Sequence, residues 1–130
     1  DFVVELFGDI PHIMDDDCIE VCNMIVEEKK YQCLLKILMD NRMSFSRVEL
    51  FKKYAHYMSE EDQATYTEYV IDDLRKHLSY AKSKSYGYIV DDIKGMYTCC
   101  EVSKKLILDF VEEVEYNYGN RPALMRLLRN

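Results

Sequence analysis

The fold is decided by the stretch EVSKKLILDFVEEVEYNYGNRP, residues 101–122. Its apolar residues recur at steps of three and four, which places them on one face of an α-helix. They are Ile107, Phe110, Val111, Val114 and Tyr118. Gly119 and Asn120 then form a C-terminal stop, and Pro122 is typical of the first turn of the next helix. The stretch therefore predicts an amphipathic helix over residues 101–118 and a short final helix after it.

Helical periodicity also marks four segments before this stretch. They cover residues 18–40, 45–58, 59–81 and 88–100. The first is either one helix or two helices that meet near residues 28–31, and the acidic cluster Asp15–Asp17 is suited to cap its start. Ser59 has an acid three residues on, at Asp62, as in a capping box. It therefore predicts the start of a long helix.

Three other regions are less regular. Ser44 or Ser46 is suited to cap the helix that follows it. Residues 83–87 have the Ser and Gly content of a loop. Residues 1–10 are mostly apolar and are followed by a proline. This pattern fits either a short helix or a strand, and the sequence does not decide between them.

Together these segments predict an all-α fold, a compact bundle of six or seven helices with short connections, in one domain over residues 1–130. A short stack of helical hairpins, built from residues 18–40 and 45–82, is the alternative. We find no sequence repeat at a fixed period, which favours the bundle. Because the chain begins at Asp1 rather than Met, we also consider a domain cut from a longer polypeptide.

The composition is typical of a globular domain in a reducing compartment. Hydrophobic residues make up 48% of the chain and charged residues 32%, as in folded proteins. The apolar runs are too short to span a membrane, and the first segment lacks the features of a signal peptide. The five cysteines cannot all pair within one chain, and most fall at apolar helical positions. We therefore expect a soluble protein with reduced thiols, no membrane partner, and a cytoplasmic or nuclear location.

The net charge of −7 is unevenly distributed along the chain. The first 28 residues contain nine acids and no Lys or Arg, whereas residues 75–88 contain four Lys or Arg and no acid. An acidic chain of this kind is a poor partner for duplex nucleic acid. The acidic first quarter and the basic segments 75–88 and 121–129 are suited to attract each other within the fold or between copies.

The sequence contains none of the common local motifs of catalysis or metal binding. It has no glycine-rich phosphate loop, His-Glu-x-x-His helix, Cys-x-x-Cys pair or Gly-x-Ser-x-Gly elbow. Cys18 and Cys22 lie one helical turn apart with His12 upstream, but the other possible zinc ligands are scattered. These patterns favour a non-catalytic chain without a metal or another cofactor. A small helical enzyme that uses Asp73 and His77, one turn apart on a helix, is an alternative.

The most unusual local composition lies between residues 75 and 88, where cations alternate with tyrosines. Tyrosine combines apolar area with a polar tip, and nearby cations are suited to hold an acidic peptide, a phosphate or stacked single-stranded bases. A solvated helix end followed by a loop would have the same composition. The candidate binding residues are Arg75, Lys76, Tyr80, Lys82, Lys84, Tyr86 and Tyr88.

The final helix is also a candidate contact surface. It has an apolar side, with Leu124, Leu127 and Leu128, and a basic side. The basic residues are Arg121, Arg126 and Arg129. An amphipathic helix of this kind either closes the core of its own domain or docks elsewhere.

The end of the long predicted helix reads Asn117, Tyr118, Gly119, Asn120 and Arg121. This run resembles the Asn-Trp-Gly-Arg motif of Bcl-2-like proteins, with Tyr in place of Trp and one additional Asn before the Arg. In size, acidity and helix count the chain is also similar to virus-encoded Bcl-2-like bundles. The resemblance implies an inhibitor of host apoptotic or immune signalling that binds its target through a groove. The run lies near the C-terminus rather than before a central helix, so we transfer no functional residue from the family.

These observations favour a non-catalytic helical domain that binds another protein or its own copy, as an adaptor, a scaffold or a self-association module. The alternatives are the Bcl-2-like inhibitor, the small helical enzyme, and a single-stranded nucleic-acid binder that uses residues 75–88. Nucleic acid is the less favoured partner because of the acidic net charge.

Overall fold

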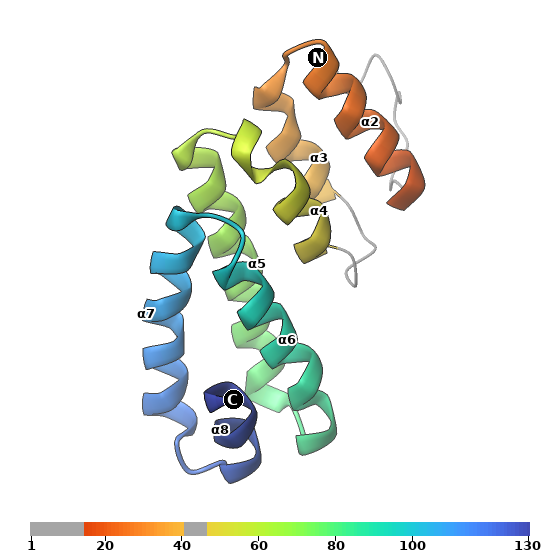
Figure 1. The fold of residues 1–130 in the computed structure, drawn as a ribbon. Helices are drawn as coiled ribbons and strands as arrows, with labels where there is room; N and C mark the ends of the chain where they lie inside the picture. Colours follow the sequence, from red (N-terminus) through yellow and green to blue (C-terminus); the bar gives the residue numbers. More distant parts are fainter. Residues whose placement is uncertain (1–14, 41–46) are drawn as a thin grey trace. The chain divides into compact units, whose positions relative to one another are not determined.

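The computed structural model of the chain describes residues 15–40 and 47–130 (Figure 1). Within these residues it contains seven α-helices and no strand, which confirms the predicted all-α class. The helices are α2 (Asp15–Glu27), α3 (Leu34–Asp40), α4 (Arg47–Tyr54), α5 (Glu60–Tyr80), α6 (Tyr86–Tyr97), α7 (Glu101–Tyr118) and α8 (Pro122–Arg129). The predictions for residues 1–10, Ser44 and Ser46 lie outside the described residues.

The chain forms two compact units, residues 1–66 and 67–130. The division falls inside the long helix α5, so this helix contributes its first two turns to the first unit and the rest to the second. Its start has the predicted cap, because the backbone N–H of Asp62 donates a hydrogen bond to the Ser59 hydroxyl over 3.1 Å.

In the first unit, α2 packs against α3, and α3 packs against α4. The sequence allowed either one helix or two over residues 18–40. The structure has two, which are separated near residues 28–31. Lys29 breaks the helix with a left-handed backbone conformation, φ 58°. The buried apolar residues include Cys18, Cys22, Ile25, Leu34, Ile37, Leu38, Phe51 and Tyr66.

In the second unit, α6 packs against α7 and α8, and α7 also packs against α8. The core is formed by one apolar face of each helix, as the periodicity predicted. Its members include Val70, Leu74, Leu78, Ile89, Ile93, Met96, Ile107, Phe110, Val114 and Leu124. The faces that these helices turn away from the core carry the charged residues of the unit.

The end of α7 agrees with the prediction. Helix α7 stops before Gly119, and this glycine has φ −59°. A Cβ atom at Gly119 would lie 2.7 Å from the carbonyl oxygen of Glu115. The close approach of the two backbones, rather than a positive φ, therefore favours glycine at this position.

Helix α6 begins earlier than the loop predicted over residues 83–87 would allow. Residues 83–85 form a single 3₁₀ turn, and Tyr86 and Gly87 already belong to the helix. Tyr86 is buried, and its hydroxyl accepts a hydrogen bond of 3.4 Å from Arg121. Burial of this aromatic ring explains why the helix includes residues whose composition is typical of a loop.

Candidate functional site

A groove lies between α5 and α7 in the second unit and encloses about 320 Å³. Its floor is apolar and is formed by Ile71, Leu106 and Phe110. Four carboxylates and one guanidinium line its sides and ends. These residues are Glu68, Asp72, Arg75, Asp109 and Glu113. Four of its charged residues are exposed, so the charged part of the groove faces solvent; they are Glu68, Asp72, Arg75 and Asp109.

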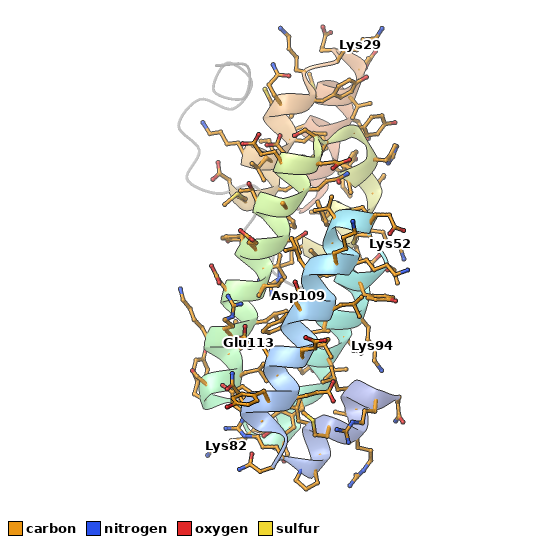
Figure 2. All side chains as sticks on the ribbon, turned by 90° about the vertical axis from the view of Figure 1, so that its left-hand side faces the viewer. Lys29, Lys52, Lys82, Lys94, Asp109 and Glu113 are labelled. Atoms are coloured by element: carbon orange, nitrogen blue, oxygen red, sulfur yellow. The ribbon has the colours of Figure 1, made fainter. Side chains whose placement is uncertain are left out.

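Helical spacing explains why these residues line one groove. On each helix they are separated by three or four positions, so they share a face. The two helices run parallel, because residue 67 of α5 contacts residue 103 of α7 and residue 75 contacts residue 113. Figure 2 shows Asp109 and Glu113 on the side of α7 that lies beside α5. The groove therefore runs along both helices for about two turns.

The two helices are joined by polar contacts at both ends of the groove. At one end the hydroxyls of Thr67 and Ser103 lie 2.6 Å apart, and both residues are fully buried. At the other end Arg75 donates two hydrogen bonds of 2.8 Å to the carboxylate of Glu113. A paired guanidinium and carboxylate of this kind hold each other in a defined orientation.

Arg75 also shows how the groove holds a cation. Its Nη1 atom donates a third hydrogen bond, of 2.6 Å, to the carboxylate of Asp72, and its guanidinium carbon lies 5.6 Å from the ring centre of Phe110. The cation thus rests on the apolar floor and bridges two acids. The hydrogen bonds between Arg75 and Glu113 lower the pKa of the Glu113 carboxyl and raise the pKa of the Arg75 guanidinium.

The remaining carboxylates give the groove its negative charge. With four acids and one arginine, its net charge is −3. Arg75 pairs with Asp72 and Glu113, whereas neither Glu68 nor Asp109 has an ion-pair partner within the described part of the chain. Two solvent-facing carboxylates beside an apolar floor are therefore available to bind a positively charged group.

The structure places the residues singled out between 75 and 88 in different surroundings. Arg75 belongs to the groove, and Tyr86 is buried in the core. The other five are exposed at the end of α5, in the 3₁₀ turn and at the start of α6. They are Lys76, Tyr80, Lys82, Lys84 and Tyr88. Tyr80 is 69% exposed and Tyr88 is 80% exposed, and Figure 2 shows Lys82 at the end of the unit.

The acidic groove was not predicted from the sequence, although the sequence contains part of its signal. Glu68 and Asp72 lie four residues apart, and so do Asp109 and Glu113. Like charges at this spacing weaken an isolated helix, so each pair is a local signal that acids gather on one face. The two acidic pairs form one site only because α5 and α7 pack side by side. No local sequence pattern shows which helices are neighbours.

The Asp73 and His77 pair lies on the surface of α5 and does not line the groove. Nδ1 of His77 is 3.3 Å from the Asp73 carboxylate and 2.9 Å from the Asp73 carbonyl oxygen. The ring of Tyr80 lies 5.9 Å away. The three residues therefore share one face as the spacing predicted, with the imidazole about half exposed.

The cysteines are all free thiols, of which Cys18 and Cys22 are fully buried and the other three are half-buried. A hydrogen bond with Cys18, together with burial, raises the pKa of Cys22 far above its usual value. In the described residues no three His, Cys, Asp or Glu side chains come together as metal ligands. His12 of the proposed zinc lead lies outside the described residues.

The two arginines of α8 and Arg121, which precedes the helix, have different environments. Arg121 points inward: it donates a hydrogen bond of 3.2 Å to the Leu78 carbonyl oxygen and lies over the Tyr118 ring. Arg129 pairs with Glu115 at 3.3 Å on the surface. Arg126 is exposed and has no ion-pair partner among the residues that the structure describes.

Comparison of the chain with protein-family models, with curated proteins and with solved structures gives no match. Within residues 15–40 and 47–130, no helix is both long enough and apolar enough to cross a lipid bilayer. The functional argument therefore rests on the geometry of the groove and of the surfaces around it.

Proposed function

We propose that this chain is a non-catalytic protein-interaction module, and that the groove between α5 and α7 is its docking site. The partner segment has an apolar side chain that contacts the floor and Lys or Arg residues that pair with the acidic sides. The observation that carries this proposal is the combination of an apolar floor with two carboxylates, Glu68 and Asp109, that have no ion-pair partner among residues 15–40 and 47–130.

The size of the groove supports a peptide segment as its ligand. A volume of about 320 Å³ is at the lower end of the range for binding pockets and accommodates one or two side chains. Recognition of a short helical or extended segment usually relies on one or two such apolar anchors with polar contacts around them. The groove is therefore suited to part of a peptide rather than to a large cofactor.

Arg75 is an internal example of the chemistry that we propose for the ligand. It places a guanidinium over Phe110 and between two carboxylates. A ligand arginine or lysine would make the equivalent contact with Glu68 and Asp109, further along the same floor. A basic ligand also reduces the repulsion among the carboxylates, which favours binding at low ionic strength.

The test is a selection of random peptides displayed on phage against the intact chain. We expect enrichment of peptides in which Lys or Arg flanks Leu, Ile or Phe. A synthetic peptide of the enriched sequence should bind with lower affinity, by tenfold or more, to the variant Glu68→Lys with Asp109→Lys, because like charges then face each other. Fluorescence anisotropy of the labelled peptide measures this change.

The matched control is Asp91→Lys with Glu112→Lys, which changes the net charge equally. Both acids are exposed in the second unit and neither lines the groove. Equal loss of binding in the control variant would mean that only the overall charge matters. Enrichment of acidic peptides, or of none, would contradict the proposed ligand.

A second candidate function is supported by the exposure of Tyr80 and Tyr88 beside Lys82 and Lys84. Exposed aromatic rings near cations are suited to stack on the bases of a single strand. If the chain binds a labelled oligothymidylate, Lys82→Glu with Lys84→Glu should abolish the binding, and added salt should weaken it. Binding that survives both changes would exclude this surface as the site.

The Bcl-2-like interpretation also concerns a groove that binds a protein segment. In this structure residues 117–121 form the end of α7 and the turn into α8, and Arg121 at the end of the run points inward. These residues are remote in sequence from α5, which forms one wall of the groove described here. The proposed site is therefore argued from its own geometry and not from that resemblance.

A further inference from the structure

We propose that the occupant of the α5–α7 groove is the outward face of α8 from a second copy of this chain. This inference rests on the proposed function, because it identifies the basic segment that the groove binds. Both surfaces belong to the same unit, residues 67–130, so each can be described by itself.

Helix α8 has the residues that the groove requires on its exposed side. Leu124 and Met125 are buried against the chain's own helices, which leaves the opposite side of α8 facing solvent. On that side lie Arg126 and Arg129, three residues apart. Leu127 follows Arg126 at the edge of this side and is 36% exposed. The exposed side therefore presents two cations, with one apolar side chain at its edge.

The charges of the two surfaces are complementary. The groove has a net charge of −3, and Glu68 and Asp109 lack a partner in the described part of the chain. Arg126 likewise has no ion-pair partner among the described residues, and the pairing of Arg129 with Glu115 is solvent-exposed at both ends. Exposed pairs of this kind are weak and are readily exchanged for others.

The lengths of the two surfaces also agree. Helix α8 has eight residues, which corresponds to about 12 Å at 1.5 Å per residue. The groove runs from residue 68 to 75 on α5 and from 106 to 113 on α7, which corresponds to about 10 Å along each helix. A two-turn helix therefore matches the groove from one end to the other.

The contact has to form between copies rather than within one chain. The buried side of α8 is held by α6 and α7 of its own unit, so its exposed side points away from that core. Because the contact joins two different surfaces, it leads either to a reciprocal two-fold dimer or to head-to-tail growth. It includes few residues, so we expect weak association that salt weakens further.

The experiment is sedimentation velocity of the full chain over a concentration series, at low and at moderate salt. We compare the wild type with a groove variant, Glu68→Lys with Asp109→Lys, and with a helix variant, Arg126→Glu with Arg129→Glu. The wild type should associate as its concentration rises. Each variant alone should associate at least about tenfold more weakly, because like charges then meet in the contact.

An equimolar mixture of the two variants is the decisive sample. In the mixture, the basic groove of one variant meets the acidic α8 of the other, and the acidic groove meets the basic α8. Association should return to near the wild-type level, which a misfolded variant would not permit. A mixture that stays monomeric, or a wild type that is monomeric at all concentrations, would overturn the inference.

The outcome also separates this inference from the proposed function. If selected basic peptides bind the groove while the wild type stays monomeric, the groove is a docking site for another protein and the second-copy inference fails. If the chain associates but the groove variant has no effect on that association, α8 docks elsewhere and the inference fails as well. If neither peptides nor copies bind, the proposed function itself is wrong.

Discussion

Tyr54 shows how one buried polar group connects two helices of the first unit. It lies on α4, is almost completely buried, and its hydroxyl donates a hydrogen bond of 2.7 Å to the side-chain oxygen of Asn23 on α2. Burial, which disfavours the charged form, raises the pKa of Tyr54 to about 12, and the nearby thiols of Cys22 and Cys18 add to the shift. The phenol is therefore held in its neutral form.

The raised pKa of Tyr54 predicts a loss of stability at high pH. In the unfolded chain a tyrosine releases its proton near pH 10, whereas folded Tyr54 retains it up to about pH 12. The folded state then binds more protons than the unfolded state, so the free energy of unfolding falls as pH rises through this window. Urea unfolding at pH 8 and pH 11, followed by circular dichroism, measures the fall.

The control for this prediction is Tyr54→Phe. It should cost about 1 kcal/mol at pH 8, because the hydrogen bond to Asn23 is lost. It should then lose less stability than the wild type between pH 8 and pH 11. An equal loss in both proteins would show that the other tyrosines and the lysines, not Tyr54, set the pH dependence.

At the scale of the elements, the pairing of α5 with α7 is what creates the groove. The buried hydroxyls of Thr67 and Ser103 contribute to this pairing at one end, and Ser103 also lies 3.1 Å from the sulfur of Cys100. A buried hydroxyl that loses its partner is costly, whereas removal of both hydroxyls is much less so. The pair therefore has a measurable coupling energy.

The coupling is tested by a double-mutant cycle with Thr67→Val and Ser103→Ala. Each single change should lower the free energy of unfolding by about 1–2 kcal/mol, and the double change by less than the sum of the two. Urea denaturation gives all three values. Additive effects would indicate that the two hydroxyls are satisfied independently and do not join the helices.

Most helix boundaries were predictable because helical periodicity is a local property of the sequence. The start of α5 at Ser59, the end of α7 before Gly119 and the start of α8 at Pro122 agree with the prediction. The start of α6 was misplaced by two residues. There the burial of Tyr86 against a segment distant in sequence outweighs a loop-like composition.

At the scale of the whole molecule, the chain divides into two compact units, and the second contains both proposed contact surfaces. We expect a fragment of residues 59–130, which keeps all of α5 and its Ser59 cap, to fold without the first unit. Its size is near the lower limit for a domain without a disulfide or a metal, so modest stability is expected.

Circular dichroism of this fragment during urea unfolding tests the expectation. A helical spectrum with a single cooperative transition should be observed, and the fragment should retain the peptide affinity of the full chain. A fragment that is helical but unfolds without cooperativity would mean that the second unit depends on the first for its packing.

The sequence by itself determined the fold class and, within the described residues, the positions of nearly all the helices. These features depend on residues three or four positions apart, or on a capping residue next to a helix end. Such relations can be read directly from the order of residues in the sequence. It also indicated the basic character of α8 and of residues 75–88. It did not indicate which of those cations remain available for a partner.

Only the tertiary structure decided where the acids gather and which cations are already paired. Arg75 looked like part of a basic surface, yet it bonds to Glu113, which lies 38 residues further along the chain. Tyr86 was a candidate binding residue from its composition, and the structure places it in the core. The physical reason is that a groove is formed by residues that meet across helices, and the packing of apolar faces throughout the unit determines which helices are neighbours.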